Sequence, residues 1–206
     1  MKRLILSLVL LLGCAALSSA QSSLVSGFSE KLASSGASFD YSFKVKTSAT
    51  VTGSGSVTYA DGRYKMLGNG LEVWCDGRSR WTVDHAAKEL YIESVEDAGT
   101  DFMGNPALLL QAVGTVFTQS SQKSSSFNGK SATQVTLIPS VSGTGLKSVS
   151  LYFNSESIPV GAMVVTEDGT SASITLSSFK FAAQASGSFS FDAGKLDKSY
   201  LVTDLR

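Results

Sequence analysis

The sequence contains few of the residues that most often carry chemistry. Among 206 residues it has one histidine, His85, and two cysteines, Cys14 and Cys75. Its 17 basic and 17 acidic side chains balance, so it lacks the positive excess that nucleic acid attracts and has no polybasic membrane-binding segment. Nucleic-acid binding is therefore not expected.

Common catalytic motifs are missing as well. The chain has no G-x-S-x-G turn, no H-E-x-x-H helix, no paired C-x-x-C and no glycine-rich phosphate loop. His85 follows Asp84, but such a pair forms no catalytic triad without a placed nucleophile. We therefore expect no enzymatic activity, no cofactor and no metal site.

The first twenty residues resemble a secretory signal peptide. Lys2 and Arg3 precede the apolar residues 4–12, which are too short to span a bilayer, and small residues follow up to Ala20. We expect residues 1–20 to be removed on export and residues 21–206 to form a single domain. Only Cys75 would then remain, as a small buried residue in an apolar strand and without a disulfide.

An alternative exists at the same place. Residues 11–14 resemble a bacterial lipobox, in which Cys14 would be lipidated and would anchor the protein to the outer membrane. Leu12 is not a preferred residue in that motif, and the small residues before Gln21 form a good cleavage site. The choice decides between a soluble shuttle and an anchored receptor.

The rest of the chain indicates a mainly β fold with a few helices. Leu24, Phe28 and Leu32 recur every four residues, which predicts an amphipathic helix over residues 22–34 that ends at Gly36. From Phe39 the apolar period changes to two, as in a half-buried strand. Asx-Gly pairs that suit tight hairpins then separate short apolar runs: 61–62, 69–70, 76–77, 128–129 and 168–169. After the first strand, these signals predict strands at 51–59, 63–67, 71–75, 79–83, 89–94, 132–138, 147–153, 159–166, 172–181 and 188–191.

A short apolar helix interrupts these strands. Asn105 suits a helix N-cap, Pro106 suits the first helical position, and Gly114 would end a helix over residues 107–113. Two short helices cannot cover a sheet of nine or more strands. Either the sheet curls upon itself, or it leaves a concave apolar groove that could hold a lipid chain.

The order of these elements resembles the outer-membrane lipoprotein carrier family, LolA, over nearly the whole mature chain. The resemblance rests on seven segments: 38–43, 55–59, 62–66, the Asp-Gly hairpin leading to Trp at 76–81, 97–110, 145–149 and 189–191. It implies an open, incomplete antiparallel β-barrel covered by the N-terminal helix and the mid-chain helix. The family's Arg-Pro pair is replaced here by Ala60 and Asp61, so Arg63 or Lys65 would have to take over the lid-latching role of that arginine.

The resemblance also implies a function. A monomeric periplasmic carrier would take acylated lipoproteins from an inner-membrane lipoprotein-releasing complex and deliver them to an outer-membrane acceptor. Burial of one methylene is worth about 0.8 kcal/mol, so a chain of about sixteen carbons resists water by on the order of 12 kcal/mol. Twelve residues are the candidate ligand site, with lid residues Phe28, Leu32, Phe102, Met103, Leu108 and Leu109 and sheet residues Tyr41, Phe43, Tyr64, Met66, Trp81 and Val83.

Two other functions remain open. An anchored acceptor similar to LolB, lipidated at Cys14, would use the same fold. A non-catalytic β-rich sensor or interaction module would have a closed core and bind protein instead of lipid.

Overall fold

The computed structural model describes residues 23–96, 105–182 and 189–206, in which twelve strands form one continuous sheet. The strand order is β12-β6-β5-β4-β3-β2-β1-β11-β10-β9-β8-β7, and every pairing is antiparallel except that of β12 with β6. The strands are β1 Ala37–Lys46, β2 Thr50–Ala60, β3 Arg63–Gly68, β4 Leu71–Cys75, β5 Ser79–Asp84, β6 Glu89–Ser94, β7 Phe117–Phe127, β8 Lys130–Pro139, β9 Leu146–Phe153, β10 Pro159–Thr166, β11 Ser171–Lys180 and β12 Leu201–Asp204.

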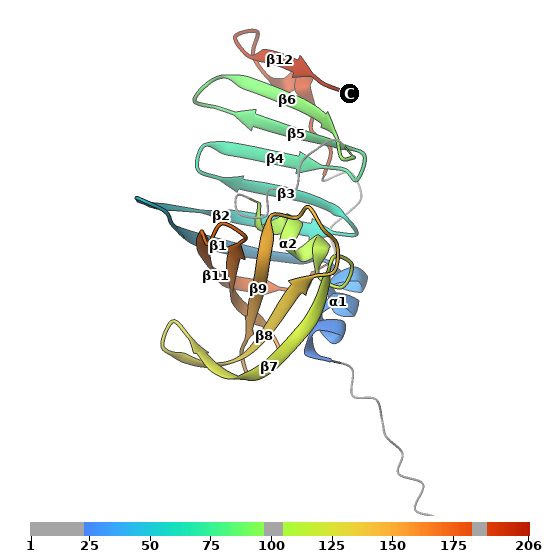
Figure 1. The fold of residues 1–206 in the computed structure, drawn as a ribbon. Coiled ribbons are helices and arrows are strands. Elements are labelled where there is room, and N and C mark those ends of the chain that lie inside the picture. The colour runs from blue at the N-terminus through green and yellow to red at the C-terminus, as the bar shows by residue number, and fades with distance from the viewer. Residues whose placement is uncertain (1–22, 97–104, 183–188) are drawn as a thin grey trace, which may run out of the picture.

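The sheet curves but does not close. Figure 1 shows β7, β8 and β9 crossing steeply relative to β3–β6, with α1 (Leu24–Ser35) and α2 (Pro106–Ala112) against the curved region. The two ends of the sheet, β7 and β12, are not paired with each other. The predicted open antiparallel sheet with two covering helices is thus confirmed.

Local sequence signals explain the boundaries of both helices. The Ser23 hydroxyl accepts a hydrogen bond from the Ser26 amide, and α1 ends at Gly36, whose φ of 64° suits glycine. The Asn105 side chain caps α2 by accepting from the Ala107 amide, with Pro106 at the first turn. Both helices lie where the sequence predicts them.

The hairpins at Asp61, Asn69 and Asn128 follow the predicted turn chemistry. In each, the Asx residue and the following glycine both have positive φ, as a two-residue turn between twisted strands requires. At Asp76 and Asp168 only the glycine has positive φ. The Asp76 carboxylate instead stabilises its turn by accepting from the amides of Arg78 and Ser79.

One strand prediction is wrong, and two strands were missed. The described residues 189–191 form no strand, and a single 3-10 turn, Ala193–Lys195, follows them. The sequence analysis missed β12, which is only four residues long, and β7, in which seven consecutive residues are exposed. Periodicity could not reveal β7 because neither of its faces is apolar.

Candidate hydrophobic ligand site

The concave face of the sheet carries the larger of two apolar clusters. Register places Phe39, Val57 and Met66 side by side on neighbouring strands, and paired residues of antiparallel strands point to the same face. The same face continues through β11, β10, β9 and β8, where Ile174, Ala162, Leu151 and Val135 are paired in turn. We call this set, together with the buried side chains of α1 and α2, the concave cluster.

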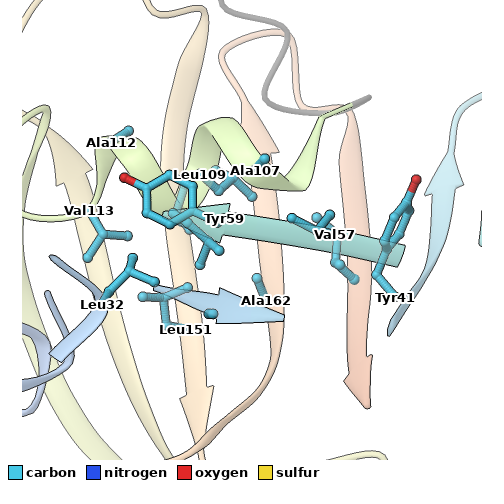
Figure 2. Close-up of a cluster of buried hydrophobic side chains, with 14 of the residues drawn as sticks. Leu32, Tyr41, Val57, Tyr59, Ala107, Leu109, Ala112, Val113, Leu151 and Ala162 are labelled. Carbon is cyan, nitrogen blue, oxygen red and sulfur yellow. The ribbon is translucent and has the colours of Figure 1, made fainter. Parts of the chain in front are cut away.

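The two helices cover the concave cluster from the same side. α1 buries Val25, Phe28 and Leu32. α2 and the residue that follows it bury almost every described side chain: Ala107, Leu109, Leu110, Ala112 and Val113. Figure 2 shows Leu32 of α1 and Leu109 of α2 converging on Tyr59, Leu151 and Ala162 of the sheet.

An aromatic group lies beneath α1. The Phe28 ring is 5.6 Å from that of Phe153, 6.3 Å from that of Phe179 and 6.1 Å from that of Phe181, between ring centroids. Phe179 also stacks on Phe39 at 5.5 Å. Aromatic pairs at these separations add to area burial. Phe153, Phe179 and Phe181 were not predicted as site residues. Phe153 follows the alternation of β9, but an irregularity at Ser178, whose φ is 54°, shifts the register of β11 before Phe179, and Phe181 lies beyond the end of that strand.

Glycines in β2 and β3 let two further rings lie flat on the sheet. A Cβ at Gly55 would lie 2.8 Å from the Tyr41 hydroxyl and 2.0 Å from the Leu67 carbonyl oxygen, and one at Gly53 would lie 2.5 Å from the Phe43 ring. These glycines therefore mark close approach, one of the two roles that glycine inside a strand commonly has. Tyr41 is fully buried, whereas Phe43 is half-buried.

One buried hydrogen bond joins α2 to the sheet. The Asn105 amide nitrogen, Nδ2, donates to the Tyr64 hydroxyl at 3.1 Å, and both residues are buried. Burial raises the pKa of Tyr64, so the hydroxyl stays protonated. Arg80 also reaches this hydroxyl and donates to Glu93 at 2.8 Å. Polar contacts thus run from the ion pair of Arg80 and Glu93, on β5 and β6, through the Tyr64 hydroxyl to the cap of α2.

Arg63 and Lys65, the two residues considered as replacements for the family's lid-latching arginine, lie on the opposite face of the sheet. Arg63 stacks over Phe189 at 5.3 Å, and Lys65 stacks over Trp74 at 3.9 Å while pairing with Glu72 at 3.5 Å. Residues of β3 alternate in direction, so both basic side chains point away from Tyr64 and from α2. The hydrogen bond between α2 and the sheet is therefore made by Asn105 and Tyr64, not by Arg63 or Lys65.

Eight of the twelve predicted site residues belong to the concave cluster. Phe28, Leu32, Tyr41, Tyr64, Met66 and Leu109 are buried in it, and Phe43 and Leu108 pack against it. Phe102 and Met103 lie outside the described residues.

Trp81 and Val83 lie apart from these eight. Trp81 is paired with Trp74, which is paired with Lys65, so both tryptophans point to the convex face of the sheet. There they form a second cluster with Val83, Leu90 and Ile92 beneath Phe191, Ala193, Leu196 and Tyr200 of the C-terminal segment. Alternation identified these residues as apolar but could not tell which face of β5 was concave.

A hollow of about 650 Å³ opens beside α1. Phe28 and Phe181 form its apolar wall together with Leu24 and Gly27. Polar residues form its rim: Ser23, Lys31, Gln122, Thr133, Asn154, Ser155, Glu156 and Ser157. Ligand sites commonly measure about 300–1,000 Å³, so the hollow has the size of such a site.

Comparison with known proteins identifies the family. The family model described as outer membrane lipoprotein carrier protein LolA matches residues 69–192, more than half of the chain. The chain belongs to the LolA family. No curated protein sequence is significantly similar to this family member.

Solved structures support the fold of this LolA family member. An uncharacterized conserved protein from Thermus thermophilus is 10% identical with a TM-score of 0.53, over 87% of this chain and 96% of its own. A DUF1329 family protein from Desulfovibrio piger is 11% identical with a TM-score of 0.50, over 84% of this chain and 96% of its own. At such identities the likeness concerns the fold alone.

Family membership indicates a lipoprotein-binding, carrier-type protein with a fold that serves binding. In the described part of the chain, no three His, Cys, Asp or Glu side chains gather as a metal site. Across residues 23–96, 105–182 and 189–206, neither helix has the length and apolar character needed to cross a membrane.

His85 contacts Tyr200 at 2.8 Å and Glu72 at 3.3 Å, and Cys75 is buried with a pKa raised by burial.

Proposed function

We propose that this chain is a periplasmic carrier that binds the acyl chains of lipoproteins and moves them from the inner to the outer membrane. Its partners are acylated lipoproteins, an inner-membrane releasing complex and an outer-membrane acceptor. Residues 1–20 are the export signal in this proposal, and the mature protein is a monomer. Family membership and the apolar concave face beneath two helices support this function.

One observation carries the proposal. Phe28 and Phe181 line the open hollow and at the same time contact each other in the aromatic group of the concave cluster. An outward movement of α1 would therefore connect the hollow with the interior of the sheet. Acyl chains would replace the contacts that Phe28 makes, and each methylene buried contributes about 0.8 kcal/mol.

The ligand site of the proposal consists of side chains of the concave cluster, of which Phe28 and Phe181 also line the hollow. It includes the eight predicted residues of the concave cluster and adds Phe153, Phe179 and Phe181. Trp81 and Val83 are left out because the C-terminal segment covers them on the other face.

Acyl binding can be tested with two matched variants. Leu24 begins α1 and lines the hollow, so Leu24→Glu puts a charge in the apolar wall while an acid near a helix N-terminus is favourable. Ile138 is exposed on the convex side, and Ile138→Glu is the control. Displacement of a fluorescent fatty acid measures the affinity for palmitate. We expect Ile138→Glu to bind palmitate as tightly as the original chain does, and Leu24→Glu to bind it at least about tenfold more weakly.

Transport itself is tested by moving a radiolabelled lipoprotein between inner-membrane and outer-membrane vesicles. The purified chain should accelerate transfer, and organic extracts of the protein isolated from the periplasm should contain acyl chains. If no acylated molecule binds or copurifies, the carrier function is excluded.

A second candidate is favoured by the packing. Phe28 and Phe153 are 4% and 0% exposed, so these side chains themselves fill this part of the concave cluster. A β-rich interaction module that binds protein would have such a closed core. Palmitate binding distinguishes the two candidates, because the interaction module should not take up acyl chains.

A further inference from the structure

The last strand of the sheet has an unusual character. β7 has eleven residues, and its buried ends, Phe117 and Phe127, enclose seven consecutive exposed residues, 118–124. Both faces of this stretch are polar, so apolar burial does not hold it in place. Its pairing with β8 is the main interaction that keeps it extended.

From Thr118 to Phe127, the outer edge of β7 pairs with no other strand in the part of the chain that the structure describes. β7 stands at one end of the strand order, next to β8 alone. A free edge presents a row of amide N–H and carbonyl groups that can pair with another extended segment. Several binding proteins recognise peptides by adding a strand in this way.

The free edge of β7 adjoins the hollow beside α1. Gln122 lies in the middle of the exposed stretch and also forms part of the rim of the hollow. Its partner on β8 is Val135, a buried residue of the concave cluster, so Gln122 marks the border between the acyl site and the edge. If the lipid of a molecule occupied the hollow, the rest of that molecule would emerge beside β7.

The composition of β7 favours a polar partner. Between residues 117 and 139 the only charged residues are Lys123 and Lys130, so nothing there repels an acidic side chain. The exposed stretch has no large apolar residue, so a second copy of this chain would gain no apolar burial by pairing edge to edge.

We propose that the edge of β7 binds the polypeptide segment that follows the acylated cysteine of a cargo lipoprotein, as a thirteenth strand. This inference rests on the proposed carrier function, since the lipid of the same cargo occupies the hollow. The added strand contributes backbone hydrogen bonds that are independent of side-chain sequence. One carrier can thereby accept many cargo proteins that share only an extended, polar segment after the lipid.

The test compares three synthetic probes with the full chain. They are a diacylglyceryl-cysteine peptide with a short tail of serine, threonine and aspartate, the same peptide without acyl groups, and palmitate. Linking two weak contacts raises the overall affinity, so we expect the acylated peptide to bind at least about tenfold more tightly than palmitate. Amide exchange across 118–124 should slow with the acylated peptide and stay unchanged with palmitate.

N-methylated peptides test the hydrogen bonds directly. Successive amides of an added strand point alternately toward β7 and away from it. Methylation of the set that points toward β7 should reduce the affinity of the acylated peptide to that of palmitate, whereas methylation of the other set should leave its affinity unchanged. Equal affinity for both methylated peptides and for palmitate would overturn the inference and leave the carrier function standing. Failure of palmitate to bind at all would instead remove the carrier function.

Proline variants test the edge from the protein side. Ser124→Pro and Ser125→Pro change adjacent residues, of which one directs its amide toward β8 and the other away from it. The variant whose lost amide pointed away from β8 should keep its melting temperature. It should still bind palmitate but should no longer bind the acylated peptide more tightly than palmitate. The other variant loses a hydrogen bond to β8 and serves as the folding control. If native mass spectrometry shows a dimer that the same proline disrupts, the edge belongs to a second copy of the chain and the inference is wrong.

Discussion

The two faces of this sheet bury apolar residues beneath different covers. On the concave face two helices lie over the cluster, and one buried side-chain hydrogen bond joins α2 to the sheet. On the convex face the C-terminal segment covers Trp81, Val83, Leu90 and Ile92 and then joins the sheet itself as β12. A cover that is part of the ladder is held by backbone hydrogen bonds, whereas a helical cover depends on side-chain packing and can move as a body. We therefore predict that the cover of the concave face moves more readily than the cover of the convex face.

The largest expected effect comes from removing the central ring on each face. Phe28→Ala and Trp81→Ala should each lower the free energy of unfolding by about 3–5 kcal/mol, because each leaves a cavity. Only Phe28→Ala should change palmitate binding, since Trp81 lies on the other side of the sheet. Urea unfolding and fatty-acid displacement measure the two effects. A matching loss of palmitate affinity in Trp81→Ala would contradict the separation of the faces.

The bond between α2 and the sheet gives the next effect. Tyr64→Phe keeps the buried ring but leaves the Asn105 amide without its hydroxyl partner, which should cost about 1–3 kcal/mol. Amides of residues 106–112 should then exchange faster with solvent, because the cap residue is released. Tyr91→Phe is the control, since the Tyr91 hydroxyl donates to the half-buried Glu89 carboxylate on the same strand and has no part in holding α2. Unchanged exchange in α2 would show that packing alone holds this helix.

The sequence predicted most of the concave face and little of the convex one. Local signals sufficed for α1, α2 and the hairpins, because Ser23, Asn105 and the Asx-Gly pairs act on their own neighbours. The partner of the Tyr64 hydroxyl could not be predicted, because Asn105 is 41 positions away. Trp81 shows the same limit, since the convex cover comes from residues more than a hundred positions later. Long-range pairing leaves no mark in local periodicity.

A smaller effect concerns the convex cover. The Tyr200 hydroxyl contacts His85 Nδ1 at 2.8 Å, and Lys88 donates to Ser199 at 3.0 Å. Tyr200→Phe should cost less than about 1 kcal/mol, because water can replace an exposed hydrogen bond. Thermal unfolding measures the loss, and palmitate affinity should stay unchanged. Ser199→Ala provides an independent comparison within the same segment.

The smallest effect is an acid-dependent loosening of the end of β12. Hydrogen bonds from Arg206 lower the pKa of Asp204 to about 2. A carboxyl whose pKa is lower in the folded state stabilises that state above its unfolded pKa, which is about 3.9, and the contribution disappears as the pH falls through about 2. Amide exchange of residues 201–206 should therefore speed up between about pH 4 and pH 2, while α2 exchange does not follow the same transition. Asp204→Asn should remove this pH dependence, and its persistence in that variant would assign the transition to another carboxyl group. Because both side chains of this ion pair are exposed, added salt should weaken it. This salt dependence separates the end of the convex cover from the buried hydrogen bond that holds α2.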